Sequence, residues 1–188
     1  VALSGSLRNL AQDLGKIAND LRLLASGPMT GLREIDLPAV QPGSSIMPGK
    51  VNPVIAEMTN MVCYQVIGCD ATVAAAAGAG QLELNVMMPV INFNLLTSCM
   101  ILNNAVKVFT EKCVKGITAS PETCRRFAES SLAIVTALNP KIGYLKAAEV
   151  AKEVLKSGKS VVQIVRERKL LTEEEIKTVL DVARMTGD

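Results

Sequence analysis

The feature that most constrains the fold is a near absence of charge over the middle of the chain. Only Glu57 and Asp70 are charged between residues 54 and 77, and no side chain is charged from residue 84 to residue 106. Both stretches are long enough for helices of several turns, which we expect at 54–77 and 85–115. A helix that is apolar on all sides must be buried, and two of them cannot be solvated on one face of a monomer. The sequence therefore predicts an oligomer whose chains share a helical bundle.

A membrane-spanning helix is the alternative for residues 84–106, because this stretch is long enough to cross a bilayer. It also contains one proline and five asparagines, whose polar groups are costly to place in lipid. These residues are Asn85, Pro89, Asn92, Asn94, Asn103 and Asn104. We therefore expect a helix buried in a protein assembly and no membrane span.

The rest of the chain also indicates helices, so the sequence predicts an all-α fold. Apolar residues recur at three- and four-residue steps over residues 3–25, which is typical of an amphipathic helix. Ser120 and Pro121 suit the N-cap and first position of a further helix, which we expect to continue to Leu138. Aromatic residues are only 3% of the chain, and no segment alternates clearly enough to predict a sheet.

A change in composition near residue 140 predicts a boundary between two domains. The tail is rich in both basic and acidic residues, arranged as three short amphipathic helices. Thr172 and Glu175 have the spacing of a capping box at the start of the last of them. We therefore expect a helical bundle over residues 1–139 and a small helical subdomain over residues 140–188.

Composition excludes several classes of function. The chain has no histidine, so no mechanism can use a histidine from within it, and its net charge of +2 predicts no nucleic-acid partner. The five cysteines form no C-x-x-C pair and lie in apolar runs, so we expect buried, reduced thiols and no metal site. Reduced thiols suit a cytoplasmic protein, and the N-terminal residues lack the pattern of a signal peptide. The cysteines are Cys63, Cys69, Cys99, Cys113 and Cys124.

A 27-residue stretch from Gly27 to Pro53 is expected to be an ordered functional loop. It contains five of the eight prolines and four of the thirteen glycines, with too many apolar residues for a free linker. Its most polar part is the segment GSSIMPGKVNP at residues 43–53, within a loop that we assign to residues 40–53. A phosphate-binding P-loop has four residues between its first glycine and a Gly-Lys pair, followed by Ser or Thr. Here five residues separate Gly43 from Gly49 and Lys50, and Val51 follows, so a P-loop is excluded. Pro48 also lacks the backbone N–H that a phosphate cradle would use.

The same segment has the groups needed to bind an anion. The backbone N–H groups of Ser45, Ile46 and Met47 can form an anion-binding concavity. Lys50 and Asn52 lie two residues apart in extended chain, so we expect them to project to one side and hold a carboxylate. A serine here can act as a nucleophile or base if such donors stabilise its alkoxide. A rigid turn whose hydroxyls cap the next helix explains the same residues equally well.

The segment GSSIMPGKVNP resembles the signature loop of the aspartase/fumarase superfamily of lyases. KIANDLRLLASGP, GQLELNVMMPV, ALNPKIGY and LLTEEEI also resemble the fumarase–aspartase branch, in matching order, so that the resemblance covers essentially the whole chain. It implies a long-helix bundle from the central domain of a tetrameric lyase, followed by a small helical C-terminal subdomain. Members of the family are much longer, so it also implies a C-terminal part that lacks the N-terminal part and is inactive alone.

The resemblance implies roles for five residues. Ser44 matches the general base that removes the Cβ proton of a succinyl-type substrate. Lys50 and Asn52 match residues that bind the substrate carboxylate, and we assign Ser45 to substrate binding as well. Glu57 matches an acidic residue that pairs with a histidine from another part of the family's protein, although a carboxylate there also suits a helix N-terminus. The resemblance implies a homotetramer with shared active sites and no redox or organic cofactor.

The expected product is fumarate, and the open question is whether ammonia or water leaves. GQLELNV, which begins at Gly80, resembles aspartases more than fumarases. We therefore expect elimination of ammonia from L-aspartate, with elimination of water from L-malate as the alternative. A non-catalytic helical assembly module is a further alternative. Helix packing alone does not need the combination of Ser44, Lys50, Asn52 and Glu57, which argues against this alternative.

Overall fold

The computed structural model describes residues 1–47 and 49–185 and divides into two compact units, Val1–Ser120 and a second that begins at Pro121. The described residues are mostly helical, which confirms the predicted all-α class. Strand structure among them is limited to two residues in each of two strands, β1 and β2. The elements of the first unit are α1 (Ala2–Leu24), β1 (Ile35–Asp36), α2 (Val54–Gly78), α3 (Met88–Lys112), the 3₁₀ helix η1 (Val114–Gly116) and β2 (Thr118–Ala119).

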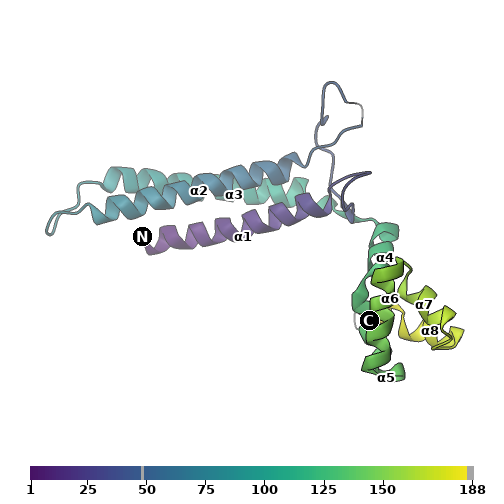
Figure 1. Ribbon diagram of the computed structural model, residues 1–188. Helices are drawn as coiled ribbons and strands as arrows, with labels where there is room; N and C mark the ends of the chain where they lie inside the picture. Colours follow the sequence, from purple (N-terminus) through teal and green to yellow (C-terminus); the bar gives the residue numbers. More distant parts are fainter. Residues whose placement is uncertain (48, 186–188) are drawn as a thin grey trace. The chain divides into compact units, whose positions relative to one another are not determined.

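The first unit is a bundle of the three long helices, with α2 antiparallel to α1 and α3 (Figure 1). Small residues let the helices approach closely: a Cβ added to Gly15 of α1 would lie 3.7 Å from the Cβ of Cys63, already in van der Waals contact. Two clusters of buried apolar residues form the core along the bundle. One contains Ala11, Cys63, Val66 and Leu102, and the other contains Ala18, Ala56, Phe109 and Cys113.

Buried polar contacts fix the register between α1 and α2. The Ser4 hydroxyl donates to Asp70 Oδ1 at 2.6 Å, and Arg8 Nη1 lies 3.1 Å from Asp70 Oδ2. Nearer the other end of α2, Asn60 Nδ2 donates to the carbonyl of Gly15 at 3.0 Å. A buried carboxylate is tolerated only when it is paired, so these partners explain how Asp70 can lie inside an otherwise apolar helix pair.

The bundle leaves apolar side chains of α2 and α3 exposed. Tyr64 of α2 is 60% exposed, and Phe93 and Leu96 of α3 are 68% and 62% exposed. By length and composition alone α2 could also cross a membrane, although a third of its most apolar window is buried inside the bundle. A surface of this kind is typical of an interaction site.

The turn between α2 and α3 explains why α3 begins later than the sequence predicts. Asn85, expected within the helix, donates from Nδ2 to the carbonyls of Ala76 and Ala77 at 3.0 and 3.3 Å. Its Oδ1 accepts from the N–H of Met87 at 2.8 Å. The side chain therefore caps α2 and closes the turn, and α3 starts only at Met88.

The second unit begins earlier than predicted, and in the part of the chain that the structure describes four helices follow residue 143 where three were expected. Its elements are α4 (Pro121–Ser130), η2 (Leu132–Leu138), α5 (Asn139–Ile142), α6 (Tyr144–Ser157), α7 (Val161–Glu167), α8 (Glu173–Val179) and α9 (Val182–Met185). We expected a boundary near residue 140, whereas the structure divides after Ser120. The reason is packing: Ile134, Val135 and Leu138 belong to one core with α6, α7 and α8.

The single helix expected from Pro121 to Leu138 is also divided in two. Ser131 has an extended backbone, and its hydroxyl accepts from the N–H of Ala133, so that it caps a new 3₁₀ helix. A serine side chain that bonds its own backbone competes with a continuous helix, which accounts for the break.

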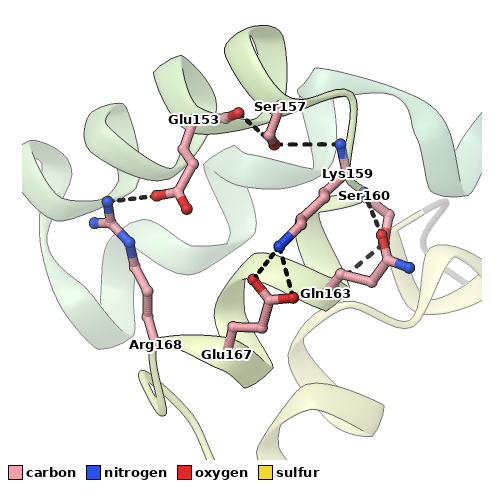
Figure 2. Close-up of polar contacts among 7 residues, drawn as sticks. All are labelled: Glu153, Ser157, Lys159, Ser160, Gln163, Glu167 and Arg168. Carbon is pink, nitrogen blue, oxygen red and sulfur yellow. Dashed lines mark hydrogen bonds and ion pairs between the residues drawn. The ribbon is translucent and has the colours of Figure 1, made fainter.

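Hydrogen bonds and ion pairs stabilise the ends of the short helices of the second unit. Figure 2 shows Lys159 bonded to both carboxylate oxygens of Glu167, at 2.8 and 2.7 Å, beside the capping box of Ser160 and Gln163. The capping box predicted at Thr172 and Glu175 is also present. The hydrogen bond from the Thr172 N–H, together with Lys141, lowers the pKa of the Glu175 carboxyl below its ordinary value.

The expectation of buried thiols holds for three cysteines. Cys63, Cys69 and Cys113 are buried, Cys124 is half-buried, and Cys99 of α3 is exposed. Burial raises the pKa of the Cys63 and Cys113 thiols, because the interior disfavours the thiolate. None of the five forms a disulfide in the structure.

Candidate active site

The residues singled out in the sequence lie on the long connection between α1 and α2, in a segment that projects beyond the end of the helix bundle (Figure 1). We call residues 40–53 the serine loop. It follows β1, which pairs antiparallel with β2 through Ile35 and Ala119 and through Asp36 and Thr118. This short ladder ties the chain before the serine loop to the chain that follows α3, so the loop starts from an anchored point.

Ser44 lies half-buried in the serine loop, and its hydroxyl oxygen is the focus of two backbone donors. The N–H groups of Ile46 and Met47 donate to Ser44 Oγ at 3.2 and 3.1 Å. We call this arrangement the hydroxyl cradle. Two of the three N–H groups predicted to form an anion-binding concavity therefore converge, and the anion they would stabilise is the alkoxide of Ser44 itself.

The two ends of the loop meet at Gly43. Its N–H donates to the carbonyl of Lys50 at 2.9 Å, and its own carbonyl accepts from Asn52 Nδ2 at 2.9 Å. A Cβ added to Gly43 would lie 2.1 Å from the Lys50 oxygen, so only glycine permits this approach. The pairing of Asn52 with Gly43 required the tertiary structure, since the sequence predicted that the Asn52 side chain points toward a ligand.

An open hollow of about 500 Å³ lies within the loop. Both Ser44 and Lys50 line it, together with apolar or uncharged neighbours such as Val40 and Met47. The structure thus brings a serine hydroxyl and a lysine ammonium to one hollow. A carboxylate could be held there by the ammonium, within reach of the serine.

The remaining predicted site residues are placed differently. The expectation that Lys50 and Asn52 point together toward a ligand is not met, because Asn52 donates into the loop at Gly43 and does not line the hollow. Ser45 is exposed at the edge of the loop, and Glu57 is half-buried in the first turn of α2. Pro48, which argued against a phosphate cradle, lies outside the described residues.

No resident metal site is apparent in the part of the chain that the structure describes. No group of three or more histidine, cysteine, aspartate or glutamate side chains there could hold a metal ion. The polar groups at the hollow are a hydroxyl, an ammonium, the carboxamide of Gln41 and backbone amides. These groups suit a small organic anion.

Two family profiles match the chain at its two ends. The profile described as Lyase matches residues 1–68, which include the serine loop, and the profile described as Fumarase C C-terminus matches residues 134–187. An aspartate ammonia-lyase of Helicobacter pylori is 54% identical over 98% of this chain and 40% of its own length. The chain belongs to the aspartase/fumarase superfamily.

Solved structures of the superfamily agree. A fumarate lyase:delta crystallin from Brucella melitensis, bound to cobalt, is 55% identical and has a TM-score of 0.92, over 97% of this chain and 39% of that protein. A class II fumarase from Schistosoma mansoni is 41% identical with a TM-score of 0.88, over 97% of this chain and 38% of that protein. This chain therefore spans about two-fifths of the length of each of these three relatives.

Proposed function

We propose that this chain is part of an aspartate ammonia-lyase, in which Ser44 removes the Cβ proton of L-aspartate. The observation that carries the proposal is the hydroxyl cradle, where the N–H groups of Ile46 and Met47 meet at Ser44 Oγ. A serine is a useful base only when its alkoxide is stabilised, and two aligned N–H donors stabilise a negative oxygen without reorganising. The same two bonds would also cap a simple turn, and the Lys50 ammonium at the same hollow is what favours a catalytic serine.

In the proposed elimination, the Ser44 alkoxide accepts the proton from Cβ, and the electrons of the C–H bond move onto the neighbouring carboxylate. Lys50 stabilises the extra negative charge on that carboxylate, an interaction that is stronger in the transition state than in the ground state. The electrons then return from the carboxylate to form the Cα=Cβ double bond, the Cα–N bond breaks with its electrons leaving on ammonia, and fumarate remains. No electron acceptor is required, since carbon is neither oxidised nor reduced overall.

The other site residues have supporting roles in this proposal. Asn52 and Ser45 bind the substrate carboxylate alongside Lys50, which requires loop closure to bring both side chains to the hollow, since neither lines it here. Glu57, in the first turn of α2, pairs with a histidine that this chain does not contain. The complete site then needs residues from outside the chain, so we expect the chain alone to be inactive.

A fumarate hydratase that acts on L-malate is the second candidate. The serine loop would perform the same proton abstraction, because both substrates carry the acidic Cβ proton beside a carboxylate. The identities support the ammonia-lyase, since the aspartate ammonia-lyase of H. pylori is 54% identical to this chain and the fumarase of S. mansoni is 41% identical. A non-catalytic assembly module is the third candidate and predicts no turnover of either compound.

We also propose a homotetramer with active sites shared between subunits, in the cytoplasm, with no nucleic-acid partner, no membrane and no cofactor. The exposed apolar side chains of α2 and α3 support the assembly, because such a face needs a protein partner in water. The net charge of +2 supports the absence of a nucleic-acid partner, and the free cysteines support the cytoplasm.

The test uses the complete protein, with L-aspartate and L-malate supplied separately and fumarate followed by its ultraviolet absorbance. We expect fumarate from aspartate, and in Ser44→Ala a kcat about 10²- to 10⁴-fold lower with an unchanged oligomer. Turnover of malate alone would replace the ammonia-lyase with the hydratase. Full activity in Ser44→Ala would remove Ser44 from the mechanism, and no activity with either compound would favour the assembly module.

A further inference from the structure

Three groups meet where the serine loop closes on itself, and we call Gly43, Lys50 and Asn52 the loop neck. The Gly43 N–H donates to the Lys50 carbonyl, and the Asn52 carboxamide donates to the Gly43 carbonyl, each at 2.9 Å. The Gly43 backbone lies so close to the returning chain at Lys50 and Val51 that an added Cβ would also lie 2.8 Å from Val51 Cα. The neck is therefore closed by one backbone bond, one side-chain bond and a contact that only glycine allows.

The neck lies directly before Ser44 in the chain. The Gly43 carbonyl and the Ser44 N–H belong to one planar peptide group, so holding the carbonyl oxygen also fixes the plane in which the Ser44 backbone begins. Ser44 Oγ then lies within 3.2 Å of the N–H groups of both Ile46 and Met47. If the Gly43 peptide rotates, the hydroxyl leaves this position and loses the donors that stabilise its alkoxide.

We propose that Asn52 is a positioning residue for Ser44: by holding the Gly43 carbonyl, its carboxamide keeps the serine hydroxyl in the cradle. This inference rests on the proposed function, because it assigns Asn52 an effect on the basicity of the catalytic serine. It does not remove the carboxylate-binding role, since the amide has two N–H protons and the bond to Gly43 uses one. The two roles differ in what a substitution does to the kinetics.

A residue that only binds the substrate carboxylate equally in ground and transition states affects KM, with kcat unchanged. A residue that holds the base in place affects kcat, and it also affects the pH at which the base becomes protonated. Losing hydrogen bonds that favour the charged form makes the alkoxide harder to form. The acidic limb of the kcat profile should then move to higher pH.

The experiment compares three variants of the complete enzyme. Asn52→Ala removes the side-chain bond, whereas Gly43→Ala opens the neck from the other side and leaves the Asn52 amide in place. Gln12→Ala is the matched control, because it truncates an exposed amide on α1, outside the serine loop and its hollow. We measure kcat and KM for L-aspartate as a function of pH in all three and in the unchanged protein.

In both neck variants we expect kcat to fall about 10²-fold, the usual cost of a misplaced catalytic group. The acidic limb of the kcat profile should also move to higher pH. In the control variant, the acidic limb of the kcat profile should stay at the same pH as in the unchanged protein. A higher KM with unchanged kcat in Asn52→Ala would show carboxylate binding alone and overturn the proposal. A lower kcat with an unmoved limb in both neck variants would also overturn it.

Trypsin gives a measurement that does not depend on activity, because it cleaves after Lys50, whose carbonyl is held in the neck. Loss of one hydrogen bond should increase the open population, and hence cleavage there, about fivefold to tenfold in both neck variants but not in the control. Equal cleavage in all variants would show that these contacts do not hold the neck closed, and would overturn the proposal. Faster cleavage together with no turnover by the unchanged protein would instead overturn the proposed function, and with it the role of Asn52, while the neck remained a structural contact.

Discussion

Replacing Leu138 with alanine tests where the second unit begins. The Leu138 side chain is fully buried in η2 and belongs to one core with residues of α6, α7 and α8. The substitution removes three carbon atoms, which at ~0.8 kcal/mol per buried methylene is about 2.4 kcal/mol of lost transfer free energy. The cavity adds to this, because a close-packed core relaxes only in part, so we expect a total of about 3 to 4 kcal/mol.

The assay is hydrogen exchange read by mass spectrometry, which reports the opening free energy of each helix separately. In Leu138→Ala we expect faster exchange in α6 and α7 and unchanged exchange in α2 and α3. Leu145→Ala is the control, since this leucine of α6 is 78% exposed and its loss should cost less than about 0.5 kcal/mol. Faster exchange in the long bundle helices, or a cost below about 1 kcal/mol, would refute the assignment of residues 121–139 to the second unit.

Three further predictions concern individual contacts. Ser4→Ala should destabilise the pairing of α1 and α2 by about 1 to 3 kcal/mol, because it leaves a buried oxygen of Asp70 without its hydroxyl donor; a change in α2 exchange below this range would contradict the contact. The lowered pKa of Glu175 means that its carboxylate stabilises the start of α8 at pH values above the ordinary value of 4.5, and that this contribution is lost as the pH falls through the lower, folded-state pKa. Titration by NMR should show this, and in Lys141→Ala the pKa should rise part of the way toward 4.5, since the hydrogen bond from Lys141 is lost while the bond from the Thr172 N–H remains. Cys99 should react with a thiol reagent in the isolated chain well before Cys63 and Cys113, which are buried and have raised pKa values; in the complete protein it should be protected if α3 is covered by another subunit, and equal labelling in both would argue against that interface.

Elements with strong local patterns were predicted closely. The helix expected at residues 3–25 is observed at Ala2–Leu24, and the one expected at 54–77 is observed at Val54–Gly78. The capping box at Thr172 was also predicted, because its two hydrogen bonds link residues only three positions apart. Boundaries set by side chains that bond distant backbone groups were missed, as at Asn85, whose amide caps the end of α2.

In the serine loop, too, the contact between near neighbours was indicated by the sequence and the longer-range contact was missed. Ser44 and its backbone donors are two and three residues apart, so their local spacing is enough to indicate the cradle. The contact between Asn52 and Gly43 spans nine residues and a close backbone approach, and the sequence suggested a different direction for the Asn52 side chain. The roles assigned to Ser44, Ser45, Lys50, Asn52 and Glu57 remain predictions.

The sequence by itself determined the all-α class, the long apolar helices and the family, because hydrophobic periodicity, local capping and an eleven-residue signature segment are properties of neighbouring residues. Only the tertiary structure decided that residues 121–139 pack with the tail, since Leu138 could have been buried equally well against either unit. It also decided that Asn52 closes the neck, because a hydrogen bond between the two ends of a loop depends on where the chain returns. Local interactions select the elements, and the placement of distant residues selects their partners.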